Sequence, residues 1–166
     1  MSIDAVTTAS AEERQLAVEL AAAVLEEAAP DEVAALDDLS AEFFANPQVA
    51  LQRDDRDEEF AFGVGLELLA PYVLAVAVPL VQWLGGLVAN GAQEALTPMV
   101  ADRIRALFRR RTSPVGTAAV PDSGLTAEQA RTAWQITVDR LQSLGVPESE
   151  ARSIGEQVAG ALVVGR

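Results

Sequence analysis

Hydrophobic residues recur at helical spacing over most of this chain, and the pattern predicts an all-α fold, a small helical bundle. We expect helices over residues 10–29, 31–45, 62–84, 92–111, 126–144 and 148–163. In the first of these, apolar side chains three and four positions apart form one face, as an amphipathic helix requires. That face contains Leu16, Ala17, Leu20, Ala21, Val24, Leu25 and Ala28.

Polar residues mark the expected helix starts in the N-terminal region. Ser10 and Glu13 fit a capping box, in which each side chain accepts a hydrogen bond from the other residue's backbone N–H. Asp31 is expected to cap the second helix, and Ser40 to begin another turn before Pro47. These elements are too short to be stable unless they pack against the rest of the protein.

The most distinctive segment is a run of 26 uncharged residues, 68–93. As a helix with about 1.5 Å rise per residue it extends about 39 Å, more than the roughly 30 Å hydrocarbon layer of a bilayer. Pro71, Pro79 and the pair Gly85-Gly86 predict a kinked or broken helix. The segment therefore predicts a central long apolar helix or hairpin.

Two interpretations of this apolar segment stay open. In the first, it engages a bilayer, either permanently or only after a trigger. In the second, it is the buried core of a soluble bundle, in which a split at Gly85-Gly86 gives two shorter helices. The residues expected in the membrane or in an interface are Leu68, Leu69, Pro71, Tyr72, Val73, Leu74, Val76, Val78, Pro79, Leu80, Val81, Trp83, Leu84, Leu87 and Val88.

Charge is strongly segregated along the chain. The net charge is −13, and residues 1–60 carry 16 acidic side chains against three basic ones. A basic amphipathic helix is expected over 92–111, directly after the apolar segment. Basic clusters in this position favour anionic lipid headgroups, whereas a chain this acidic repels nucleic-acid phosphates. The expected headgroup-binding residues are Arg103, Arg105, Arg109, Arg110 and Arg111.

The last part of the chain predicts a helical hairpin. Thr126 and Gln129 fit a second capping box, Gly145 ends the first helix and Pro147 opens the second. Two helices alone bury little surface, so the hairpin needs the rest of the chain or another protein to cover it. Its apolar residues are expected in the core or in an exposed seam that docks a partner helix: Trp134, Val138, Leu141, Ile154 and Val158.

Domain boundaries follow from composition. Residues 112–124 are rich in proline and glycine and are typical of a linker. They separate a helical bundle, residues 1–111, from the C-terminal hairpin, residues 125–166.

Several kinds of chemistry are excluded by missing residue types. The chain has no Cys, His or Lys, which removes disulfides, Ser-His and Cys-His catalysis, imidazole metal sites and the phosphate-loop lysine. Residues 122–124, Asp-Ser-Gly, match a short aspartic protease string once only, and a turn is the plain interpretation. The acidic run 55–59 lacks the glycine and glutamate of a calcium loop. We expect no catalytic, cofactor or metal-binding residue and no small-molecule substrate.

These features predict a non-enzymatic, membrane-active or membrane-associated protein. The use of arginine at all 12 basic positions, together with abundant Ala and Val, predicts a bacterial source with a GC-rich genome. Acidic N-terminal helices shield the apolar segment, and a trigger releases residues 62–111 onto or into a bilayer. The arrangement is similar in principle to helical pore-forming domains that hide an apolar hairpin in a soluble shell. The alternative is a soluble adaptor or assembly subunit whose apolar segment forms a protein interface. In either case we expect a homo-oligomer, and the absence of a signal peptide in residues 1–30 favours the cytoplasm, with movement to the inner membrane.

Overall fold

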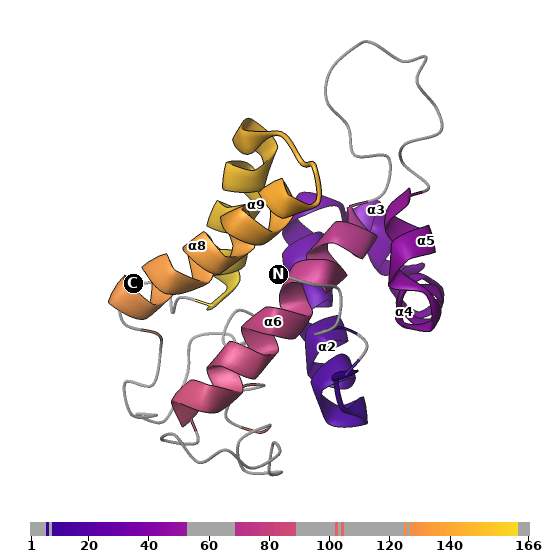
Figure 1. The fold of residues 1–166 in the computed structure, drawn as a ribbon, viewed down its shortest axis with the longest axis horizontal. Helices are drawn as coiled ribbons and strands as arrows, with labels where there is room; N and C mark the ends of the chain where they lie inside the picture. The colour runs from indigo at the N-terminus through magenta and orange to yellow at the C-terminus, as the bar shows by residue number, and fades with distance from the viewer. Residues whose placement is uncertain are drawn as a thin grey trace, which may run out of the picture.

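The computed structural model describes residues 6, 8–52, 69–88, 102, 104, 125 and 127–162. Within these ranges every regular element is an α-helix (Figure 1), which confirms the predicted all-α helical bundle. The helices are α2 (Ala11–Ala28), α3 (Pro30–Val33), α4 (Leu36–Ala45), α5 (Pro47–Gln52), α6 (Ala70–Val88), α8 (Ala127–Ser143) and α9 (Glu148–Leu162).

Helix α2 begins at the predicted capping box. The Glu13 N–H donates to Ser10 Oγ at 3.2 Å, and the Ser10 N–H donates to Glu13 Oε2 at 2.6 Å. Ala28 ends the helix two residues before Pro30. The predicted apolar face is buried at six of its seven positions, and Ala28 is half-buried.

The segment predicted as one helix over residues 31–45 forms two helices. Pro30 is the first residue of α3. A backbone N–H at this position makes no hydrogen bond within the helix, so a proline, which lacks the N–H, is tolerated there. The prediction of Asp31 as the cap is wrong, because Ala29 holds the cap position and Asp31 lies inside the first turn. A two-residue turn at 34–35 then separates α3 from α4.

Helix α4 uses its small and aromatic residues to contact the bundle. The prediction that Ser40 begins a helical turn is wrong, because Ser40 lies inside α4 and its hydroxyl donates to the Asp37 carbonyl at 2.9 Å. Phe43 is fully buried and meets Phe44 edge to face at 5.4 Å. The Arg14 guanidinium lies 5.5 Å from the Phe44 ring centre, which connects α2 to α4 by a cation–π contact.

Helix α6 is the central element of the bundle. It packs most closely against α2 and also contacts α8, α4 and α5. Figure 1 shows it crossing between the N-terminal helices and the C-terminal hairpin. The predicted central apolar helix is therefore confirmed.

The C-terminal hairpin ends its first helix as predicted. Gly145 has φ of +88°, a left-handed conformation that glycine adopts without steric cost. The Val146 N–H donates to the Leu141 carbonyl at 3.1 Å and the Gly145 N–H to the Gln142 carbonyl at 3.0 Å. These two bonds are those of a Schellman motif, which satisfies carbonyls at the helix end. Thr126, the cap residue of the second predicted box, lies outside the described residues.

The hairpin is covered by the rest of the chain. Helix α9 packs against α2 and α8 packs against α6, so buried side chains of both parts belong to one hydrophobic cluster. Of the predicted helix 92–111, the structure describes Asp102 and Ile104, both helical, and Ile104 is fully buried. The predicted linker 112–124 lies outside the described residues, so the division into two domains stays a prediction.

Candidate functional site

The candidate functional site is α6 together with the helices that cover it. From Ala70 to Val78 all nine residues are buried, so the first two and a half turns are enclosed on every side. The last turns are less covered, and Leu87 is 38% exposed. A helix enclosed on every side is apolar all round, as this sequence is.

Most of the residues predicted for the membrane or an interface lie inside the chain's own core. Leu69, Pro79 and Trp83 are half-buried and Leu87 is exposed. Leu68 and the side chain of Val88 lie outside the described part. The buried residues of the predicted set are Pro71, Tyr72, Val73, Leu74, Val76, Val78, Leu80, Val81 and Leu84.

Of the two forms predicted for this segment, kinked or broken, the broken one is wrong within α6. Helix α6 is continuous from Ala70 to Val88 and passes through Gly85-Gly86 without a split. Its predicted bounds, 62–84, are also shifted, because Leu69 is not helical. Pro71 falls in the first turn, where a helix tolerates proline, and only Pro79 lies in the interior.

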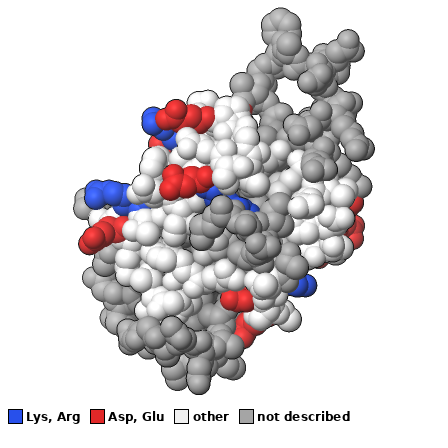
Figure 2. Space-filling model, viewed as in Figure 1, with Lys and Arg blue, Asp and Glu red and all other residues white. Residues whose placement is uncertain are grey.

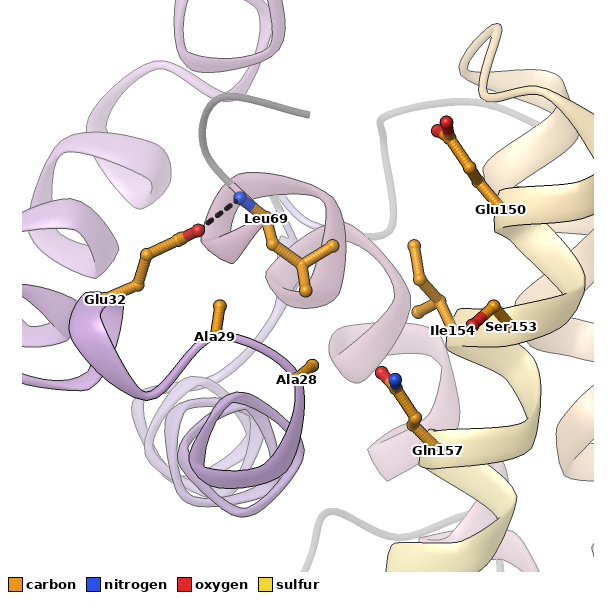
Figure 3. A pocket seen from close by; sticks show the side chains of 8 residues that line it. All are labelled: Ala28, Ala29, Glu32, Leu69, Glu150, Ser153, Ile154 and Gln157. Atoms are coloured by element: carbon orange, nitrogen blue, oxygen red, sulfur yellow. Dashed lines mark hydrogen bonds between the residues drawn. The ribbon is translucent and has the colours of Figure 1, made fainter. Parts of the chain in front are cut away.

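A carboxylate from another helix caps the start of α6. Glu32, on α3, accepts hydrogen bonds from the Leu69 N–H at 2.8 Å and from the Ala70 N–H at 2.7 Å, one at each carboxylate oxygen. Figure 3 shows the Glu32 carboxylate turned towards the Leu69 nitrogen. A negative side chain here also complements the positive end of the helix dipole.

Glu32 is the one important residue of this site that sequence reasoning missed. It is 37 residues from Leu69 in the chain, and no local motif connects the two. The available signal was Pro71, since a proline near an apolar segment's start is typical of a first helical turn that needs a cap. The sequence could not show which side chain supplies that cap.

A cavity lies beside this contact. It has a volume of about 230 Å³ and is open to solvent. Figure 3 shows the side chains of Leu69 and Ile154 facing each other across it, with Glu32 on one side and α9 on the other. The lining residues are Ala28, Ala29, Glu32, Leu69, Glu150, Ser153, Ile154 and Gln157.

The N-terminal cover of α6 is strongly acidic. Within residues 11–52, which form α2 to α5, Arg14 is the sole basic residue. Figure 2 shows red acidic groups at several separate places on a largely uncharged face. Among the described residues of this view, white residues separate the red groups, so the acidic groups drawn there do not form one continuous patch. The acidic residues of this cover are Glu12, Glu13, Glu19, Glu26, Glu27, Asp31, Glu32, Asp37, Asp38 and Glu42.

The predicted headgroup-binding arginines all lie outside the described residues. They are Arg103, Arg105, Arg109, Arg110 and Arg111. The acidic block 54–59 lies outside them as well.

Most of the residues predicted to dock a partner are buried within this chain. Val138, Leu141, Ile154 and Val158 are at most 5% exposed, and Trp134 is half-buried. The expected need for cover is met inside this chain by α2 and α6.

The described residues were also compared with what a metal site and a membrane-spanning helix require. In the described part no group of three or more acidic side chains is placed to hold a metal ion. Over the same part, one segment, Ala70–Leu87 in α6, is long and apolar enough to cross a membrane, and 72% of it is buried. Core helices of soluble proteins meet the same criterion, so length and composition alone leave both interpretations open.

Comparison with known proteins gives no relative. No family model matches the chain, and no curated protein or solved structure is similar to it.

Proposed function

We propose that this chain is a non-enzymatic, membrane-active protein that keeps α6 covered in water and delivers it to a bilayer after its acidic cover has been displaced. The observation that carries the proposal is the enclosure of one helix of membrane-spanning length by other helices of the same chain, of which α2 and α4 are acidic. The cover and the bilayer compete for the same apolar surface.

The magnitude of this competition follows from hydrophobic transfer. Full exposure of about a dozen large apolar side chains costs on the order of 20 kcal/mol, at about 1.5 to 3 kcal/mol each. That cost exceeds the total stability of most domains, about 5 to 15 kcal/mol. Release of α6 into water is therefore unfavourable, and release requires lipid to take over as the protein contacts are lost.

The negative charge of the helices that cover α6 fits a role as a reversible shield of that helix. Residues 11–52 carry ten carboxylates against one arginine, and this excess of negative charge repels anionic lipid and keeps the resting protein off such surfaces. Carboxylates in the first turns of α2 and α4 also stabilise these short helices through the helix dipole. The five arginines after the apolar segment are the proposed headgroup ligands, at roughly 1 kcal/mol each.

The test follows Trp83, which lies in α6, with Trp134→Phe removing the other tryptophan of the chain. We expect the Trp83 emission to shift to the blue with anionic vesicles and to be quenched by brominated lipid chains. Changing Arg103, Arg105 and the 109–111 cluster to Gln should weaken this binding and its salt dependence. The matched control changes Arg131 and Arg152, two exposed hairpin arginines, to Gln.

The proposal fails if Trp83 gives no quenching with vesicles of any composition, including after mild heating that loosens the cover. Dye release from the same vesicles separates insertion from surface binding. Quenching without dye release would indicate association with the membrane and no pore.

A second candidate is a soluble helical interaction protein, from the alternative interpretation of the sequence. Its supporting observation is that the chain's own helices bury most of α6 with no lipid present. A monodisperse oligomer by light scattering, together with no vesicle binding, would favour it. Since the first turns of α6 are already enclosed, its oligomer interface would involve exposed apolar groups such as Val49 and Leu87.

A further inference from the structure

The contact between Glu32 and the start of α6 is polar, and it comes from a very short helix. Helix α3 has four residues, none of them fully buried, and Val33 is its apolar residue packed against the core. Its side chain at position 32 nevertheless makes two hydrogen bonds to backbone N–H groups 37 and 38 residues away. This contact is a polar connection of α3 to α6.

The start of α6 depends on this carboxylate for its hydrogen bonds. The first four backbone N–H positions of a helix have no acceptor within the helix. In α6 these are Leu69, Ala70, Pro71 and Tyr72; Glu32 serves the first two, and Pro71 has no N–H. Ala70 is fully buried, so loss of Glu32 removes the acceptor of a backbone N–H at a buried position.

We propose that Glu32 is a latch: its carboxylate holds the first turn of α6 in the bundle, and loss of the two hydrogen bonds frees that turn from the acidic cover. The local opening is a property of the fold alone. Only its consequence at a bilayer rests on the proposed function.

Hydrogen exchange of the full chain tests the opening. In Glu32→Ala and Glu32→Gln, amide exchange in the first two turns of α6 should rise about ten- to a hundredfold, the range expected when hydrogen bonds to a charged group are lost. The matched control is Asp31→Asn, which removes the same charge from the neighbouring exposed position. The control should exchange like the wild type.

Exchange in α8 and α9 provides an internal reference. If the Glu32 variants match Asp31→Asn, the latch does not exist. If exchange rises by the same factor in α8 and α9, Glu32 supports global stability only, and the proposal of a local latch is overturned.

A double variant tests whether Glu32 holds α6 to α3 or only caps the first turn of α6. In Glu32→Ala with Leu69→Ser, the serine hydroxyl can cap α6 locally but does not reach α3. Together with the proposed membrane function, a latch predicts that binding to anionic vesicles rises in Glu32→Ala and stays raised in the double variant. A return to wild-type binding would mean that Glu32 acts only as a helix cap.

The two proposals can fail separately. Faster exchange at the start of α6 without vesicle binding keeps the latch and refutes the membrane function. Vesicle binding in the wild type, with exchange unaffected by Glu32→Ala, keeps the membrane function and refutes the latch.

Discussion

Gly155 shows how closely the two hairpin helices approach each other. A Cβ atom at this position would lie 3.0 Å from Cδ1 and Nε1 of Trp134 and 3.0 Å from Cγ2 of Val138. Contacts this short force the neighbouring side chains to move, and added methyl groups in packed cores cost about 1 to 3 kcal/mol. We expect Gly155→Ala to lower the free energy of unfolding by that amount, measured by urea denaturation.

The matched control for this substitution lies on the same helix. Gly160 has no atom within 4 Å of the position a Cβ would take. Gly160→Ala should stabilise the protein by about 0.5 to 1 kcal/mol, because alanine favours helix over glycine. Equal effects of the two substitutions would show that helix propensity, and not the contact with Trp134, decides the result at Gly155.

At the scale of single helices, Pro79 is the main departure from local rules in α6. It lies in the helix interior and lacks the N–H that would donate to the carbonyl of Ala75, a fully buried residue. We expect Pro79→Ala to raise the free energy of unfolding by up to about 3 kcal/mol, measured by urea denaturation. A loss of stability would instead mean that packing of the half-buried proline ring outweighs the missing hydrogen bond.

The same substitution bears on the proposed function. If α6 must leave the bundle before it inserts, a more stable α6 should bind vesicles more slowly. Faster binding by Pro79→Ala would contradict displacement of α6 as the limiting step.

Helix ends set by neighbouring residues could be predicted from the sequence, whereas ends set by distant contacts could not. The capping box at Ser10 and the left-handed Gly145 involve partners within five residues, and both predictions are confirmed. The start of α6 was misplaced because its cap, Glu32, comes from another helix. The break at 34–35 was missed because no proline or glycine marks it.

In the candidate site, too, local features could be predicted from the sequence and contacts between distant helices could not. Composition identified the apolar segment, and periodicity identified the faces of α2 and the hairpin. Neither could show that α2, α4, α5 and α8 together enclose α6, since that enclosure depends on contacts between helices far apart in the chain. Hydrophobic runs of this kind are compatible with both lipid and protein surroundings.

At the scale of the whole molecule, the open question is whether the hairpin folds with the rest of the chain. Composition predicts a linker at 112–124 and two units. The contacts of α8 with α6 and of α9 with α2 favour a single cooperative unit, because neither part keeps its core covered without the other.

Two tryptophans allow the two parts to be followed separately. Trp83 lies in α6 and Trp134 in α8, and the sequence has no others. Trp134→Phe leaves a reporter for the bundle, and Trp83→Phe leaves one for the hairpin. We expect each reporter to give the same urea midpoint as helix content measured on the same variant by circular dichroism, as a two-state transition requires.

Separate midpoints within one variant would show that the hairpin unfolds independently and would support the two-domain interpretation of the sequence. Coincident midpoints have a consequence for the proposed release of α6. Since α8 then loses its cover when α6 leaves, and α9 packs against α8 in the same cooperative unit, insertion should expose the hairpin. Amide exchange in α8 and α9 should therefore increase on vesicle binding, and unchanged protection there would contradict a complete departure of α6 from the bundle.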